Sequence, residues 1–130
     1  MHLKLITHDR IVFDEDVNEI YTRGVDGEFG ILENHQPLMT ALDVGVTKVV
    51  QPDSTRMFTT MGGIFQFKDN NAIILTDIAE SGDDIDVARA RAALERAEAR
   101  LADKNAEIDA KRAEAAIARA KARLKVALNK

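Results

Sequence analysis

The sequence contains no cysteine and no tryptophan, and only two prolines among its 130 residues. Without cysteine the chain has neither disulfides nor thiolate metal ligands, which fits a reducing compartment. Its apolar runs are far shorter than the roughly 20 residues of a transmembrane helix, and its first residues lack the basic and apolar segments of a signal peptide. We therefore expect a cytoplasmic protein whose mature form begins near Met1.

Sequence patterns that indicate catalysis are also missing. The three histidines, His2, His8 and His35, lie on separate segments without the spacing of metal ligands, so no metal site is expected. The chain has neither the glycine-rich phosphate loop that ends in Lys and Ser or Thr nor the Gly-x-Ser-x-Gly motif of hydrolases. We expect no catalytic residue within this chain.

Glycine and aromatic residues are missing from the last 48 residues. All seven glycines and all six aromatic residues lie at or before Gly82, whereas sixteen of the nineteen alanines lie after it. Residues 1–82 carry 6 basic and 13 acidic side chains, a balance of −7, and residues 83–130 carry 12 and 9, a balance of +3. The sequence therefore predicts an acidic β domain over residues 1–82 and a basic helical arm over residues 83–130.

Short segments of the first part alternate apolar and polar residues, as half-buried strands do. The predicted strands are residues 3–6, 11–13, 17–21, 44–50, 56–60, 64–67 and 72–75. No helical pattern intervenes between them, which favours an antiparallel sandwich or barrel, and we predict a β-sandwich. Gly24, Gly27 and Gly30, followed by a polar run around Pro37, are interpreted as a shaped surface loop that is either structural or presented to a partner.

After a linker over residues 79–84, apolar residues recur at alternating steps of three and four. The first run is Val87, Ala90, Leu94, Ala97 and Leu101, and the second is Ala110, Ala113, Ile117, Ala120, Leu124 and Ala127. These runs predict two antiparallel helices, at about 86–102 and 108–128, with a turn at 103–106. A buried alanine methyl contributes about 0.8 kcal/mol, against roughly 1.5–3 for a leucine side chain, so the seam is weak. Because alanine is the best helix former, movable helices are one interpretation and a static hairpin is the other.

Basic residues gather on the helical arm. The segment 111–125 contains one acidic residue, Glu114, and six basic ones: Lys111, Arg112, Arg119, Lys121, Arg123 and Lys125. Arg119 and Arg123 share one helix face, as do Arg89 and Arg96 on the first helix. In an antiparallel hairpin these four guanidiniums can converge on a polyanion such as a triphosphate.

Two other interpretations of the basic residues were weighed. The first is a solvated charged face, in which Asp86 and Arg89 form an ordinary pair three residues apart. The second is nucleic acid binding, which is disfavoured by the net charge of −4 and by the lack of aromatic residues near the basic segment. We expect no nucleic acid partner.

Several short motifs occur in order along the chain: Gly27-Glu-Phe-Gly-Ile-Leu, His35-x-Pro-Leu-x-Thr-Ala-Leu, Gly62-Gly-Ile-Phe, Thr76-Asp and Ile85-Asp-Val-Ala-Arg-Ala. Together with the break at Gly82, they resemble the epsilon subunit of bacterial F-type ATP synthases, which is called delta in mitochondria. The resemblance implies an α+β chain with an N-terminal antiparallel β-sandwich of about ten strands and a C-terminal antiparallel two-helix hairpin. It also implies a non-catalytic rotor subunit of the central stalk, held at the cytoplasmic face of the bacterial cell membrane only through the complex.

The resemblance further implies partners and a ligand. The sandwich would bind the gamma subunit and rest on the ring of c subunits, with Glu28 and His35 facing the ring. The hairpin would either fold against the sandwich or extend along gamma, where Lys111, Arg112, Arg119, Lys121, Arg123 and Lys125 would meet the beta subunit and inhibit ATP hydrolysis. In bacillus-like members, ATP binds the folded hairpin as a regulatory ligand, with magnesium left open. The matching residues are Glu80, Ile85, Asp86, Arg89, Ala90, Arg96, Arg119 and Arg123.

Two further functions stay open at this point. The chain could be a passive structural linker in the rotor that binds no nucleotide. It could also be a free-standing nucleotide sensor without an assembly partner.

Overall fold

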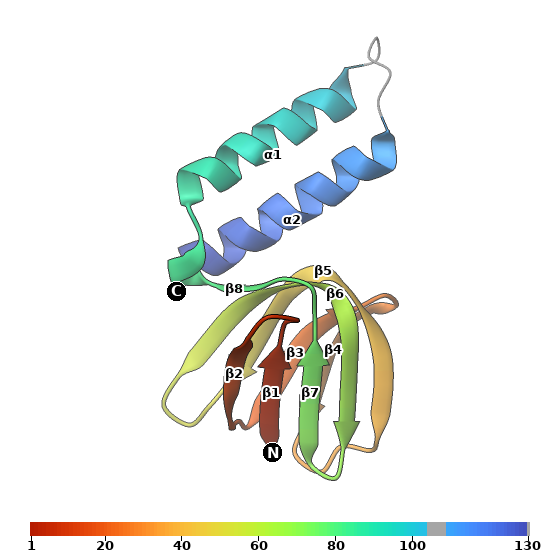
Figure 1. Ribbon diagram of the computed structural model, residues 1–130, viewed down its shortest axis with the longest axis vertical. Helices are drawn as coiled ribbons and strands as arrows, with labels where there is room; N and C mark the ends of the chain where they lie inside the picture. Colours follow the sequence, from red (N-terminus) through yellow and green to blue (C-terminus); the bar gives the residue numbers. More distant parts are fainter. Residues whose placement is uncertain (104–108, 130) are drawn as a thin grey trace.

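The computed structural model describes residues 1–103 and 109–129, which form an all-β body that carries a helical hairpin (Figure 1). The strands in this part of the chain are β1 (His2–Ile6), β2 (Ile11–Asp16), β3 (Glu19–Gly24), β4 (Gly27–Leu32), β5 (Leu38–Val50), β6 (Thr55–Lys68), β7 (Asn71–Leu75) and β8 (Ala79–Ser81). A short 3-10 turn over Gly82–Asp84 leads to α1 (Val87–Ala102) and α2 (Ala110–Leu128). The predicted fold class, a β domain followed by a two-helix hairpin, is confirmed.

The sheet folds into two layers because β5 and β6 are long enough to take part in both. The first half of β5 pairs with the second half of β6, and this layer continues through β7 and β1 to β2. The second half of β5 pairs with β3, which pairs with β4, while the first half of β6 pairs with β8. Residues 1–103 and 109–129 contain eight continuous strands where about ten were expected, and the difference vanishes when the halves of β5 and β6 are counted separately.

Large apolar side chains fill the space between the layers. Phe13 and Phe58, from opposite layers, meet edge to face with their ring centroids 5.6 Å apart. Phe29 and Phe65 make the same contact at 5.3 Å. Such aromatic pairs contribute about 0.5–1.5 kcal/mol beyond the burial of their area. The aromatic contacts therefore hold the two layers of the sandwich together through its core.

The strand β6 passes from one layer to the other at Gly62 and Gly63. Both residues have a positive φ, 78° and 110°, which costs little only for glycine. A Cβ on Gly63 would also lie 2.0 Å from the carbonyl oxygen of Leu75. The segments 56–60 and 64–67, predicted as two strands, are thus the two halves of one strand that bends at a glycine pair.

Two segments contradict the sequence predictions. The glycine-rich segment interpreted as a surface loop contains β4, which pairs with β3 along its whole length. Glycine is rare in strands, so the pattern concealed this one. At Gly30 a Cβ would lie 2.7 Å from the ring of Tyr21, so a larger residue there requires that ring to move. The expected linker over residues 79–84 begins with β8, whose three residues pair with β6.

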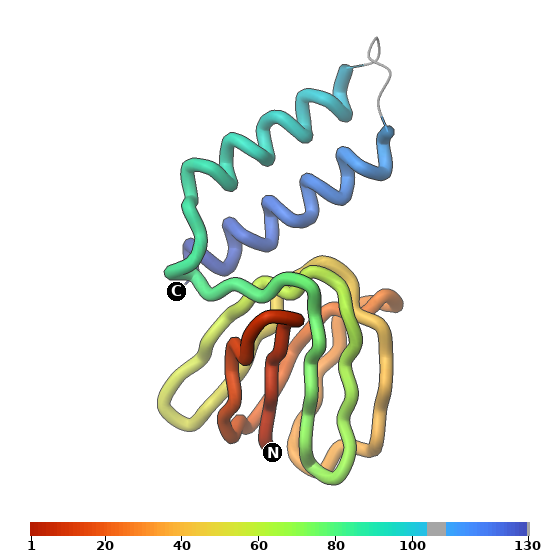
Figure 2. The backbone as a smooth tube through the Cα atoms, in the orientation of Figure 1, coloured from red at the N-terminus to blue at the C-terminus, as the bar shows by residue number. Residues whose placement is uncertain are grey.

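The helix α2 lies between the sandwich and α1 (Figures 1 and 2). Ala113 and Ala120 are buried on its face toward α1, and Ala122 and Val126 are buried on its face toward β5 and β6. The predicted seam contained the first of these faces but not the second. Neither helix in the described part of the chain has the length and apolar character that crossing a bilayer requires.

Aspartates cap both helices. Asp86 accepts a hydrogen bond from the backbone N–H of Arg89 at 3.0 Å, and Asp109 accepts one from that of Arg112 at 3.2 Å. These caps start α1 at Val87 and α2 at Ala110, close to the predicted starts. Ile108 and the expected turn residues 104–106 lie outside the described residues.

Candidate functional site

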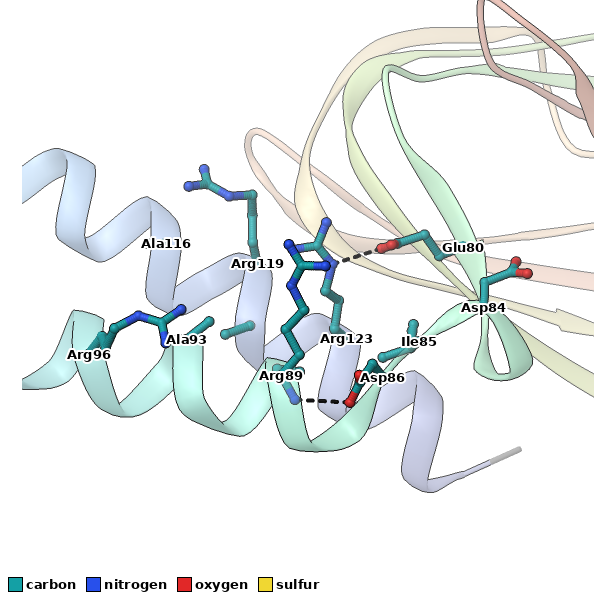
Figure 3. A pocket seen from close by; sticks show the side chains of 12 residues that line it. Glu80, Asp84, Ile85, Asp86, Arg89, Ala93, Arg96, Ala116, Arg119 and Arg123 are labelled. Atoms are coloured by element: carbon teal, nitrogen blue, oxygen red, sulfur yellow. Dashed lines mark hydrogen bonds and ion pairs between the residues drawn. The ribbon is translucent and has the colours of Figure 1, made fainter.

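A groove of about 460 Å³ lies between α1 and α2, next to the point where the hairpin joins the sandwich (Figure 3). All eight residues matched to ATP binding by the resemblance line it: Glu80, Ile85, Asp86, Arg89, Ala90, Arg96, Arg119 and Arg123. The sequence did not identify four others: Asp84, Ala93, Ala116 and Ala120. Three of these are alanines that lie three or four residues from a lining arginine. That spacing places them on the same helix faces as the arginines and could have identified them from the sequence. Their small side chains leave room between the helices.

Among the described residues, one of the four arginines in the groove, Arg123, forms an ion pair. Asp86 uses Oδ1 to cap α1, so it binds the backbone N–H of Arg89 rather than its guanidinium. Within residues 1–103 and 109–129, no ion pair involves Arg89, Arg96 or Arg119. The side-chain pair of Asp86 and Arg89 that belongs to the solvated-face interpretation is therefore not among the ion pairs of the described residues, and Figure 3 shows Arg89 and Arg123 coming to the groove from different helices.

Arg123 is held by a carboxylate of the sandwich. Its Nε donates to Oε1 of Glu80 at 2.9 Å, with the Arg123 and Glu80 side chains 31% and 22% exposed. The same Oε1 accepts a hydrogen bond from the hydroxyl of Thr59 at 3.0 Å, and the backbone N–H of Glu80 donates to that hydroxyl at 3.0 Å. Thr59 is fully buried in β6. These three residues connect α2 to the sandwich, and an anion that binds Arg123 must compete with Glu80.

The carboxylates gather where the groove meets the sandwich. Asp84 accepts two hydrogen bonds from Ser81, one from the backbone N–H and one from the hydroxyl, both at 3.0 Å. The first has the larger effect, and together they hold the pKa of Asp84 below its usual value although burial opposes them. Arg10, 3.9 Å away, lowers that pKa further. Asp84 thus stays charged beside Glu80 and Asp86. The groove is acidic at this end and basic along the helices.

The basic residues assigned to the beta subunit point in several directions. Lys111 and Lys121 are exposed. Arg112 lines the continuation of the groove toward the far end of the hairpin. Lys125 lies over the sandwich and lines a separate pocket with Lys48 and Glu28. In the folded hairpin these side chains therefore form no single patch.

The structure does not bring together the two residues assigned to the c ring. Glu28 is near the start of β4 and lines the pocket that contains Lys125. His35 follows the end of β4, where its ring meets Phe67 edge to face at 6.1 Å. The length of β4 separates them, because the segment is a strand rather than one loop.

Histidine and carboxylate side chains meet at the edge of the sandwich, away from the groove. The ring of His2 lies between Asp14 and Asp16. The hydrogen bond with Asp14 has the larger effect on the pKa of His2, and both hydrogen bonds raise it. Among the described residues no three His, Cys, Asp or Glu side chains are arranged to hold a metal ion. The arginine-lined groove is therefore the candidate site.

Comparison with known proteins covers both parts of the chain. The family described as "ATP synthase, Delta/Epsilon chain, beta-sandwich domain" matches residues 1–82, and "ATP synthase, Delta/Epsilon chain, long alpha-helix domain" matches residues 83–127. The ATP synthase epsilon chain of Pelotomaculum thermopropionicum is 45% identical over 102 residues, which cover 78% of this chain and 76% of that protein. The ATP synthase epsilon chain of Desulforamulus reducens is 43% identical over 104 residues, covering 80% and 79%.

Solved structures have the same fold. A chain of the Euglena gracilis mitochondrial ATP synthase, solved as OSCP/F1/c-ring, superposes with a TM-score of 0.82 at 26% identity and covers 97% of this chain and 79% of that one. A chain of the Tetrahymena thermophila mitochondrial ATP synthase central stalk and c-ring shares the fold, with a TM-score of 0.56 at 15% identity over 98% and 93% of the two chains. The fold, the two family matches and the bacterial relatives lead to one conclusion: this chain belongs to the family of ATP synthase delta/epsilon chains.

Proposed function

We propose that this chain is a non-catalytic rotor subunit in the central stalk of an F-type ATP synthase. In this role its sandwich binds the gamma subunit and the c ring, and thereby couples the ring to the catalytic head, which makes ATP from ADP and phosphate with a proton gradient. The chain is a peripheral part of that membrane-bound complex, on the cytoplasmic face of the bacterial membrane. Family membership supports the role, as do relatives solved within c-ring assemblies.

The observation that carries this proposal is an apolar row on the outer face of the sandwich. Strand pairing aligns one residue from each of five strands: Ala41, Ile64, Leu75, Ile6 and Ile11. Ile64, Leu75 and Ile11 are exposed to 49%, 50% and 55%. A contiguous exposed apolar row of this kind marks a protein–protein interface. We assign this face to the gamma subunit.

Replacing Leu75 with aspartate is expected to weaken binding to gamma by about ten- to a hundredfold, since it puts a charge at the centre of the apolar face. Leu75 points to solvent, so the sandwich should keep its melting temperature. The measurement is co-purification of the chain with gamma and beta subunits. Val25→Asp, at a residue 58% exposed in the turn between β3 and β4, makes the same change elsewhere. Equal retention of both variants would contradict the assignment.

The second part of the proposal concerns the hairpin, which we infer binds ATP as a regulatory ligand when folded. The groove volume of about 460 Å³ is suited to a small ligand. Guanidiniums on both helices, of which only that of Arg123 forms an ion pair among the described residues, offer the planar donor geometry that phosphate oxygens accept. The carboxylates at the sandwich end can accept hydrogen bonds from an amino group such as that of adenine.

A ligand in this groove favours the folded arrangement because its partners come from both helices and from β8. A ligand shifts a two-state equilibrium only by its difference in affinity for the two states, and a change from 1:99 to 99:1 needs about 5.5 kcal/mol. The alanine seam adds little to the stability of the folded arrangement, to which the docking of α2 on β5 and β6 and the ion pair of Arg123 with Glu80 also contribute. Without the ligand, the extended hairpin would present its basic residues to the beta subunit and inhibit ATP hydrolysis.

The nucleotide site is tested by titrating ATP into the parent, Arg89→Ala and Arg123→Ala by calorimetry. Each variant is expected to lose about tenfold or more in affinity, because a hydrogen bond to a charged group contributes about 1.5–3 kcal/mol. Lys121→Ala, which removes one exposed charge outside the groove, should bind as the parent does.

Unchanged affinity in both arginine variants would discard the site. If ATP also fails to raise the melting temperature of the parent, the interpretation that remains is a passive structural linker in the rotor. A chain that binds ATP but does not co-purify with gamma would instead be a free-standing nucleotide sensor.

A further inference from the structure

The groove between the helices extends beyond the part next to the sandwich, where we propose that ATP binds. It continues toward the far end of the hairpin as a second hollow of about 810 Å³, here called the distal groove. The two halves share Ala93, Arg96, Ala116 and Arg119. The distal groove adds Arg100 from α1 and Arg112 from α2. We propose that the hairpin binds a linear polyphosphate longer than a triphosphate, with Arg100 and Arg112 as the distal subsite.

The arginines form two rows along the hairpin. On α1 they are Arg89, Arg96 and Arg100, and on α2 they are Arg123, Arg119 and Arg112. From the sandwich outward the steps are seven and then four residues on α1 but four and then seven on α2, so the middle arginines of the two antiparallel rows are offset along the hairpin. The first and last arginine of each row are eleven residues apart, or roughly 16 Å at 1.5 Å per residue. The row of positive charge is therefore longer than the half of the groove next to the sandwich.

The floor of the distal groove fits a thin, flexible anion. Ala93, Ala97, Ala113 and Ala116 line it between the arginines, so a chain of phosphates can approach the helices closely. A guanidinium can bind two oxygens of one phosphate at once. No aromatic residue occurs after Gly82, so the hairpin offers no aromatic ring on which the bases of a single-stranded nucleic acid could stack. This distinction favours polyphosphate over an oligonucleotide.

Two carboxylates mark the far end of the distal groove. Asp103 and Asp109 follow α1 and precede α2, and both line the hollow there. Asp109 is already engaged in capping α2 through the backbone N–H of Arg112. Four arginines and these two carboxylates line the distal groove. These carboxylates bring negative charge to the part of the distal groove that Arg100 and Arg112 line.

A polyphosphate in this position would bridge the two helices along most of their length. It would neutralise guanidiniums on both helices, and so would hold the hairpin closed more firmly than a triphosphate. The inference does not rest on ATP binding, because the ligand carries no base and the distal pair lies outside the half of the groove next to the sandwich.

The test compares inorganic tripolyphosphate with long-chain inorganic polyphosphate, titrated into the full chain by calorimetry at fixed ionic strength. The parent is expected to bind the long chain at least about tenfold more tightly, since each exposed ion pair adds up to about 1 kcal/mol. In the double variant Arg100→Ala/Arg112→Ala that preference should fall to about threefold or less.

The matched control is Arg91→Ala/Lys121→Ala, which removes the same charge from two exposed residues that line neither groove. It should keep the preference of the parent. Thermal melts of both double variants establish that they are folded, as expected for changes at the helix surface.

Three results would overturn the inference: no preference for the long chain in the parent, equal loss in the two double variants, or equally tight binding of an oligonucleotide with the same charge. Failure of ATP to bind, with the long-chain preference intact, would refute the nucleotide site alone. ATP binding without that preference would refute only the distal subsite.

Discussion

Replacing Gly63 with alanine is expected to lower the free energy of unfolding by more than about 4 kcal/mol, which is exceptional for a single substitution. The added Cβ would lie 2.0 Å from the carbonyl oxygen of Leu75 and 2.8 Å from Cα of Thr76. Both are backbone atoms at the end of β7, which is fixed by pairing with β1 on one side and β6 on the other. They cannot rotate away as a side chain would, so relief requires the strands to separate.

The neighbouring glycine provides the control for this prediction. Gly62 also has a positive φ, 78°, but the nearest atom to its added Cβ would be the Leu42 carbonyl oxygen at 4.0 Å. Gly62→Ala is therefore expected to cost about 1–2 kcal/mol, the penalty of the left-handed backbone alone. Urea denaturation measures both variants, and similar losses would show that the contact with β7 does not decide the outcome.

Replacing Val126 with aspartate is expected to release the hairpin from the sandwich. Val126 is 0% exposed, on the face of α2 that rests on β5 and β6. Burying a polar group without a partner costs about 1–3 kcal/mol, and more when it is charged. We therefore expect the equilibrium between docked and undocked hairpin to shift toward the undocked form by more than about tenfold. A fluorophore pair on the sandwich and near Leu128 should report a longer distance in the variant.

Lys121→Asp introduces the same side chain at an exposed position of α2 and should leave the hairpin docked. The sandwich has its own core of buried residues, so its melting temperature should change little in either variant. The prediction would be contradicted if the hairpin stayed docked in Val126→Asp. It would also be contradicted if the sandwich unfolded when the hairpin was released.

The fold class was predictable because alternation in strands and three-four spacing in helices both record local burial. The strand β4 was missed because Gly27 and Gly30 interrupt that alternation, and β8 because three residues carry too little pattern. The second buried face of α2, with Ala122 and Val126, was missed for another reason. Which additional face is buried depends on contact with β5 and β6, and spacing within the helix cannot reveal that contact.

The site was predictable only in part. The spacing of Arg89, Arg96, Arg119 and Arg123 indicated shared faces, and the antiparallel hairpin then brings them to one groove. Glu80 and Arg123 are 43 residues apart, so no local pattern could pair them, and only the family resemblance pointed to Glu80. Asp86 was predicted as an ATP-binding residue, with a side-chain pair to Arg89 as the alternative, and neither interpretation included its role as N-cap of α1, although an aspartate just before a helix is a common N-cap.

The hairpin is attached to the sandwich near one end, where Gly82–Asp84 precedes α1 and the last turns of α2 lie close by, while its other end extends away (Figure 2). This geometry makes it a lever arm. α1 has 16 residues, or roughly 24 Å at 1.5 Å per residue. A pivot of about 30° near Gly82 would sweep its far tip through about 12 Å. Because the ion pair of Glu80 and Arg123 lies near the attachment, a small rearrangement there would move the far end of the hairpin much further than the ion pair itself.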